Sequence, residues 1–133
     1  SKIRLMGYET MQGARNWKRL LVKDCMDVVQ PDIGWGGGFS ELRKICLMAH
    51  AFSKPVSLHS FGSAVHFAAS LHLAASLPNS LSLESEENPN RLKSELLINP
   101  LIHDENMNFF IPNQPGLGIE LNPDTINDLA VNV

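Results

Sequence analysis

The chain has 133 residues, which is enough for one domain and too few for two of ordinary size. Its composition is that of a globular protein, and its net charge of −3 argues against nucleic acid and anionic membranes as partners. No apolar run reaches the roughly 20 residues that span a bilayer. Cys25 and Cys46 lack metal-type spacing, so we expect reduced core thiols in a cytoplasmic protein. The absence of an initiator methionine suggests a piece of a longer chain.

Short apolar runs alternate with helix-length segments along the first two thirds of the chain. The expected strands are residues 3–7, 27–30, 56–58 and 81–84. The expected helices are residues 15–25, a segment that follows an N-cap at Ser40 and ends before Pro55, and residues 63–77. This alternation predicts a parallel α/β barrel or open sheet over residues 1–84.

The regular pattern ends at residue 84. Residues 85–133 are rich in proline and asparagine and form an irregular tail with short extended pieces at 108–111 and 118–121. Asn122 followed by Pro123 predicts a last short helix that runs through Ala130. The domain division expected from the sequence is therefore 1–84 and 85–133.

A strongly polar residue follows each of the last three expected strands. These residues are Asp32, His59 and Glu84. Neighbouring parallel strands lie about 5 Å apart, so Asp32 and His59 can come within hydrogen-bonding reach. A carboxylate bonded to an imidazole fixes its tautomer and yields a general acid or base near neutral pH. Each residue alone could be structural, but three in phase favour chemistry.

Five motifs stand out along the chain: Gln30-Pro31-Asp32, the glycine loop followed by Glu41, His59-Ser60-Phe61-Gly62, Pro78-Asn79 before Glu84, and the tail 111–119. Together they resemble the enolase superfamily, mandelate racemase subgroup, and within it the sugar-acid dehydratases most of all. The resemblance covers nearly the whole chain but only the last four strands of the family's barrel. It implies an α/β fold: the C-terminal half, about four βα units, of a (β/α)8 TIM-type barrel plus the irregular tail.

The resemblance also implies roles for individual residues. Asp32 and His59 match the family's acid/base dyad, which removes the proton next to a carboxylate or protonates a leaving hydroxyl. Glu84 matches the residue that hydrogen-bonds the enolate. Glu9 matches a carboxylate ligand of Mg²⁺, although the family's usual Gly-Glu is here Gly7-Tyr8-Glu9. The expected substrate is a small carboxylate, a sugar acid, and a metal and a hydrogen-bond donor would stabilise its developing charge.

Two further residues are expected to contact substrate: Trp35 in the glycine loop and Ser60 beside His59. Ser60 and Ser63 lack a Gly-x-Ser-x-Gly elbow, which argues against a serine hydrolase. A flavodoxin-like domain is disfavoured because no phosphate loop follows the first strand. The other histidines have no ligand spacing, so we interpret them as surface or packing residues: His50, His66, His72 and His103.

The family's lysine base, its other metal carboxylates and its capping domain match nothing in this chain, so the Mg²⁺ site is expected to be incomplete here. Half a barrel has two open strand edges, which are a liability in water. The chain should therefore associate with a missing N-terminal half or with itself. Two functions stay open: a metal-dependent dehydratase, or a related racemase or epimerase, of which this chain is one part, and a non-catalytic remnant or assembly module.

Overall fold

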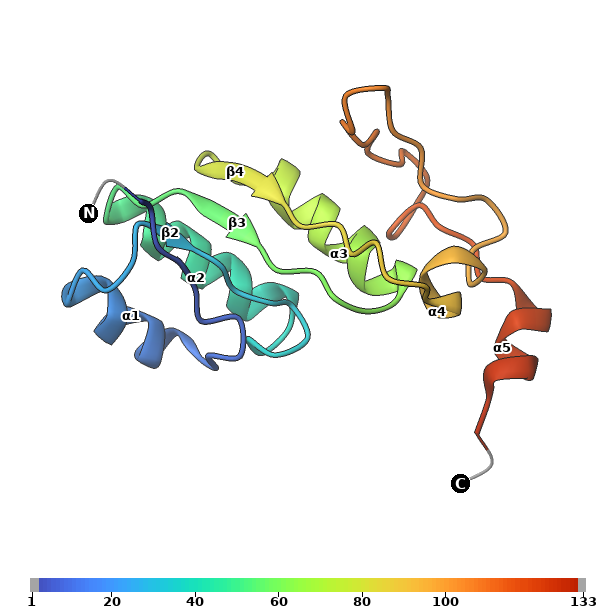
Figure 1. The fold of residues 1–133 in the computed structure, drawn as a ribbon, viewed down its shortest axis with the longest axis horizontal. Helices are drawn as coiled ribbons and strands as arrows, with labels where there is room; N and C mark the ends of the chain where they lie inside the picture. The colour runs from blue at the N-terminus through green and yellow to red at the C-terminus, as the bar shows by residue number, and fades with distance from the viewer. Residues whose placement is uncertain (1–2, 132–133) are drawn as a thin grey trace.

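The structure, a computed structural model, describes residues 3–131 (Figure 1). The strands are β1 (Met6–Gly7), β2 (Val28–Val29), β3 (Val56–Leu58) and β4 (Ser80–Leu83). The helices are α1 (Ala14–Val22), α2 (Phe39–Ala51), α3 (Ala64–Ala75), α4 (Arg91–Ser94) and α5 (Pro123–Leu129). The body is elongated, with the βα units at one end and the tail with α4 and α5 at the other.

The strands form one parallel sheet in the order β1-β2-β3-β4. Each strand pairs with the next one in the chain, and a helix lies between successive strands. A doubly wound open sheet would reverse its strand order at a switch point, whereas a barrel does not. The sequential order therefore favours the barrel-type arrangement, and it brings the carboxyl ends of all four strands to one edge.

The hydrophobic core lies between this sheet and α1, α2 and α3. Val56 and Leu58 of β3 are buried in it, and the period of two along a strand turns Ser57 to the opposite face. There the Ser57 hydroxyl bonds that of Ser82 on β4 at 2.7 Å. By the same period of two, His59 follows on the same face as Ser57. The core residues are Trp17, Leu21, Met26, Val29, Ile33, Leu42, Ile45, Cys46, Ala49, Val56, Leu58, Leu73, Ala74 and Leu77.

Strands β1 and β2 and the helices are shorter than predicted, β3 has the predicted bounds, and β4 begins and ends one residue earlier than predicted. One predicted cap is wrong. Helix α2 begins at Phe39 with Gly38 at its N-cap, so Ser40 lies inside the helix. The cause is the glycine loop: Gly38 has a φ of 84°, and Gly36 approaches Leu42 and the Asp32 carbonyl so closely that a Cβ would lie 2.8 Å from that oxygen. Ser63, by contrast, caps α3 and accepts a hydrogen bond from the His66 N–H.

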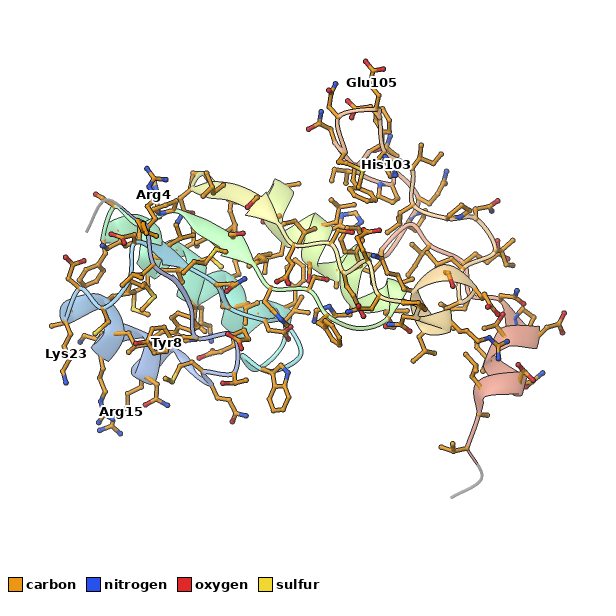
Figure 2. The ribbon with its side chains drawn as sticks, viewed as in Figure 1. Arg4, Tyr8, Arg15, Lys23, His103 and Glu105 are labelled. Carbon is orange, nitrogen blue, oxygen red and sulfur yellow. The ribbon has the colours of Figure 1, made fainter. Side chains whose placement is uncertain are left out.

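The tail contains no regular strand among its described residues. The predicted extended pieces form isolated antiparallel bridges instead, His103 with Phe109 and Leu97 with Leu121. The Phe109 ring packs edge-on against Phe67 of α3, with centroids 4.8 Å apart. Figure 2 shows His103 and Glu105 on a loop that projects from the body. The last helix begins at the predicted Pro123, capped by Asn122, and ends at Leu129.

None of the helices in residues 3–131 is long and apolar enough to cross a membrane.

The sequence missed α4, a single turn capped by Asn90, because one turn is too short to show a helical period. The division of the chain at residue 84 stays a prediction.

Candidate active site

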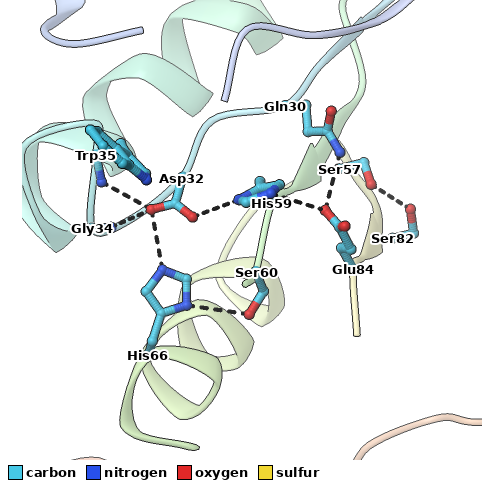
Figure 3. Close-up of polar contacts among 10 residues, drawn as sticks. All are labelled: Gln30, Asp32, Gly34, Trp35, Ser57, His59, Ser60, His66, Ser82 and Glu84. Carbon is cyan, nitrogen blue, oxygen red and sulfur yellow. Dashed lines mark hydrogen bonds and ion pairs between the residues drawn. The ribbon is translucent and has the colours of Figure 1, made fainter. Parts of the chain in front are cut away.

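The polar residues predicted at the strand ends meet at one edge of the sheet (Figure 3). Beyond β2 and β3 the chain continues the parallel pairing with a bridge between Asp32 and His59. The His59 N–H donates to the Pro31 carbonyl at 3.1 Å, and the Glu84 N–H donates to the Leu58 carbonyl at 3.0 Å. The backbone of three successive strand ends is thus fixed before any side chain is considered.

The predicted contact between the carboxylate and the imidazole is present. The Nδ1 of His59 lies 2.7 Å from Oδ2 of Asp32. A carboxylate can only accept, so Nδ1 carries the proton and donates it. This bond leaves Nε2 of His59 as the nitrogen that can take up or release a proton at the open side of the sheet.

Asp32 is 2% exposed and is held by donors on both oxygens. Its Oδ1 accepts hydrogen bonds from the backbone N–H of Gly34 at 2.6 Å and of Trp35 at 2.9 Å. Gly34 lies close against this carboxylate, because a Cβ there would lie 3.2 Å from Oδ1, which is tighter than an ordinary contact. The loop after β2 therefore wraps around the carboxylate and fixes its plane.

The electrostatic consequence is that Asp32 keeps its charge. Burial by itself raises the pKa of this carboxyl group, but the hydrogen bonds from His59, the Trp35 N–H and His66 together outweigh burial and hold the pKa below its ordinary value. Asp32 is thus a permanent anion near neutral pH. It can orient an imidazole and stabilise its protonated form without itself exchanging a proton.

Glu84 lies on the other side of His59. Its Oε2 is 3.8 Å from Nε2 of His59 and accepts a hydrogen bond from the Gln30 side chain at 3.3 Å. Both Glu84 and His59 are partly exposed, whereas Asp32 is buried. The reactive nitrogen and a second carboxyl group therefore face the same accessible space.

The two predicted substrate contacts differ in their accessibility. Trp35 is 55% exposed, so its indole is free to meet a ligand near the glycine loop. Ser60 is 3% exposed, and its hydroxyl lies 3.3 Å from Nδ1 of His66. In this structure Ser60 is directed to a neighbouring histidine, so its predicted substrate contact has no geometric support.

His66, which the sequence analysis interpreted as a surface or packing residue, belongs to this cluster. Its Nε2 lies 3.2 Å from Oδ1 of Asp32. The residue stands in the first turn of α3, and its backbone N–H is bound by the capping Ser63. The available signal was this cap, which places the first helical turn beside the strand end that carries His59. The other α3 histidine, His72, contacts the Leu117 carbonyl at 3.0 Å and has a packing role.

The described residues do not by themselves fit a Mg²⁺ site. Glu9 follows β1 and is half-buried, but residues 3–131 contain no group of three histidine, cysteine or acidic side chains that could hold a metal ion. Mg²⁺ requires near-octahedral oxygen coordination, for which a single carboxylate is insufficient. No chemical step is therefore derived through a metal.

A family model described as enolase C-terminal domain-like matches residues 1–125. The chain belongs to this family. The resemblance to the mandelate racemase/muconate lactonizing enzyme-like members of the enolase superfamily is thereby confirmed, and so is the fold class, half of a TIM-type barrel.

Relatives of this enolase-type chain include enzymes of sugar acids. D-galactarolactone cycloisomerase of Agrobacterium fabrum is 31% identical over 97% of the chain. The crystal structure of 3,6-anhydro-D-galactonate cycloisomerase from Zobellia galactanivorans is 30% identical over 96% of the chain, with a TM-score of 0.88. That of a mandelate racemase/muconate lactonizing enzyme from Jannaschia sp. CCS1 is 30% identical over the whole chain, with a TM-score of 0.86.

The chain spans only about a third of the length of these relatives. It covers 36% of the Agrobacterium and Zobellia proteins and 33% of the Jannaschia protein. A large part of each relative therefore has no counterpart in these 133 residues.

Proposed function

We propose that this enolase-type half-barrel supplies the acid/base edge of an enzyme that removes the proton next to the carboxylate of a sugar acid. The observation that carries the proposal is the 2.7 Å bond from Nδ1 of His59 to the charged Asp32. It fixes the ring in the tautomer whose Nε2 can accept a proton, and it leaves that nitrogen facing the accessible side of the sheet.

The proposed step begins with neutral His59. Its Nε2 takes the α-proton of the substrate, and the electrons of the C–H bond form an enolate. Asp32 stabilises the imidazolium that results, as a buried anion bound to Nδ1. In a dehydration the enolate then expels the β-hydroxyl, which takes the proton from Nε2 and leaves as water. His59 returns to its neutral form.

Glu84 is proposed to hydrogen-bond the enolate oxygen when it carries a proton. Its carboxyl group lies beside Nε2 of His59, where the substrate's reacting carbon would be bound. Trp35 is proposed to line the substrate site, since its indole is exposed next to the loop that holds Asp32. The protonated carboxyl group of Glu84 would be the hydrogen-bond donor that the developing negative charge of the enolate requires.

Mg²⁺ is proposed as the cofactor of the whole enzyme on the strength of the family resemblance. When bound, it would neutralise charge on the substrate's carboxylate. Glu9 can contribute one ligand, and the remaining ligands must come from outside the described residues. This requirement is consistent with the coverage of the relatives, of whose length the chain spans only about a third.

Cycloisomerisation is a second candidate reaction, favoured by the names of the Agrobacterium and Zobellia relatives. The same proton abstraction could also end in racemisation or epimerisation. To test these candidates, the protein at its natural length is incubated with Mg²⁺ and, in turn, with D-galactarolactone, 3,6-anhydro-D-galactonate and each member of a panel of linear sugar acids.

The products distinguish the candidates by mass and by NMR. Loss of one water indicates a dehydratase, and an unchanged mass with an altered ring indicates a cycloisomerase. No conversion across the panel, with the protein folded and metal present, would argue for the non-catalytic alternative, an assembly module that keeps the fold.

A further inference from the structure

Two imidazoles share the single carboxylate of Asp32. His59 binds Oδ2 at 2.7 Å from the end of β3, and His66 binds Oδ1 at 3.2 Å from the first turn of α3 (Figure 3). Both side chains are largely buried around a carboxylate that is 2% exposed. The proposed reaction uses His59 and Asp32 but assigns nothing to His66.

The surroundings of His66 allow it to carry either charge state. Its Nε2 must donate to the anionic Asp32, which leaves Nδ1 facing the Ser60 hydroxyl at 3.3 Å. A hydroxyl can donate to a neutral Nδ1 or accept from a protonated one. His66 can therefore take up a second proton by a rotation of the Ser60 hydroxyl alone, with both ring nitrogens still bonded.

The charged groups around this pair are few among the described residues. Asp32 is the charged side chain in contact with His66, and Glu84 is the next carboxyl group, on the far side of His59. On α4, which also packs against α3, Lys93 is paired with Glu87. Nearby Glu86 is bound to the Asn90 amide. One anion thus faces two groups that can each become cationic.

We propose that His66 is a positioning residue, which holds Asp32 with its Oδ2 toward His59. Because Asp32 carries one negative charge, protonation of His66 competes with protonation of His59 for that charge. The functional meaning of this coupling rests on the proposed acid/base role of His59. Its physical content does not, because the contacts of His59 and His66 with Asp32 are present whether or not a substrate reacts.

The test is an NMR titration of the imidazole ring nitrogens in the ¹⁵N-histidine-labelled protein at its natural length. In the wild type the His59 curve should be broader than that of a single proton. In His66→Gln, which keeps an N–H donor but cannot be protonated, it should follow a simple curve whose midpoint lies at a higher pH. His72→Gln, on the same helix but bonded to the Leu117 carbonyl, is the matched control and should leave the curve unchanged.

A second variant, His66→Phe, keeps a planar aromatic ring at this position without a donor, and either variant suffices if the other fails to fold. An identical His59 curve in the wild type and the folded variant would overturn the proposal. The readout needs no substrate, so its failure leaves the proposed function standing. If the wild type turned over no substrate while its His59 curve still changed in the His66 variants, only the proposed function would be refuted.

Discussion

At the scale of single residues, the site is defined by how many donors surround one carboxylate. Asp32 accepts from two backbone N–H groups and two imidazoles. The contact with His59 could be expected from the sequence, because both residues follow neighbouring strands. The contact with His66 was missed, because spacing along a helix says nothing about a partner on the loop after β2; the available signal was Ser63, whose cap sets the start of α3.

The titration of Asp32 predicts acid sensitivity with a definite sign. The pKa of Asp32 in the folded state lies below its ordinary value of 3.8, so the unfolded state binds this proton more tightly. The stabilisation is complete above about pH 4 and is lost as the pH falls through the lower folded value. In Asp32→Asn the free energy of unfolding should fall less steeply below pH 4. Urea titrations over a pH series measure the free energy of unfolding, with Glu105→Gln on the projecting loop as the control. The prediction would be contradicted if this free energy fell equally steeply with pH in both variants and in the wild type.

The two cysteines should differ in reactivity. Cys46 is fully buried in the core, and burial raises the pKa of its thiol to about 12. Cys25 is half-buried and free. Because the thiolate is the nucleophile, alkylation of the native protein should modify Cys25 first and Cys46 only on unfolding. Peptide mapping after iodoacetamide treatment checks this, and equal modification of both under native conditions would show that the core is open.

At the scale of elements, the order of strands and helices was predictable, but most of their ends were not. The apolar runs and intervening stripes located every βα unit, because they reflect burial. Caps depend on local backbone geometry, which is why Ser40 was wrongly chosen over Gly38. Ser63 was predicted only as the first residue of a helix over 63–77, and the structure shows it as the N-cap of α3. A glycine loop with a positive φ ends in a helix without needing a capping side chain.

These two serines give a matched pair of substitutions. Ser63→Ala removes the hydroxyl that accepts from the His66 N–H, and it should lower the free energy of unfolding by about 1 kcal/mol. Ser40→Ala replaces an exposed serine inside α2 and should be neutral or slightly stabilising, since alanine favours helix. Chemical denaturation of both variants measures the difference; equal stabilities would contradict the assignment of the caps.

At the scale of the whole molecule, the sheet is open at both edges. Among the described residues, β1 and β4 each have one strand neighbour, and Leu81 on β4 is 54% exposed. Unpaired edges with apolar side chains favour association. We therefore expect the 133-residue chain to pair with a missing barrel portion or with itself.

Light scattering tests this expectation against the monomer mass of 14.7 kDa. The isolated chain should show at least twice that mass, and Leu81→Lys should shift it toward the monomer by placing a charge at the β4 edge. Val22→Lys on α1, where the side chain is 63% exposed, is the control and should have no effect. A monomer for the unmodified chain would mean that the edges need no partner.

The central claim is that Nε2 of His59, oriented by Asp32, moves the proton next to the substrate's carboxylate. The most direct measurement is exchange of that α-proton in D₂O, followed by ¹H NMR, with the protein at its natural length, Mg²⁺ and a sugar acid that the screen identifies. We expect exchange with the wild type, its loss by a factor of about 100 or more in His59→Asn, and a similar loss in Asp32→Asn. His103→Asn, on the projecting loop, should exchange at the wild-type rate. Undiminished exchange in a folded His59→Asn would contradict the claim.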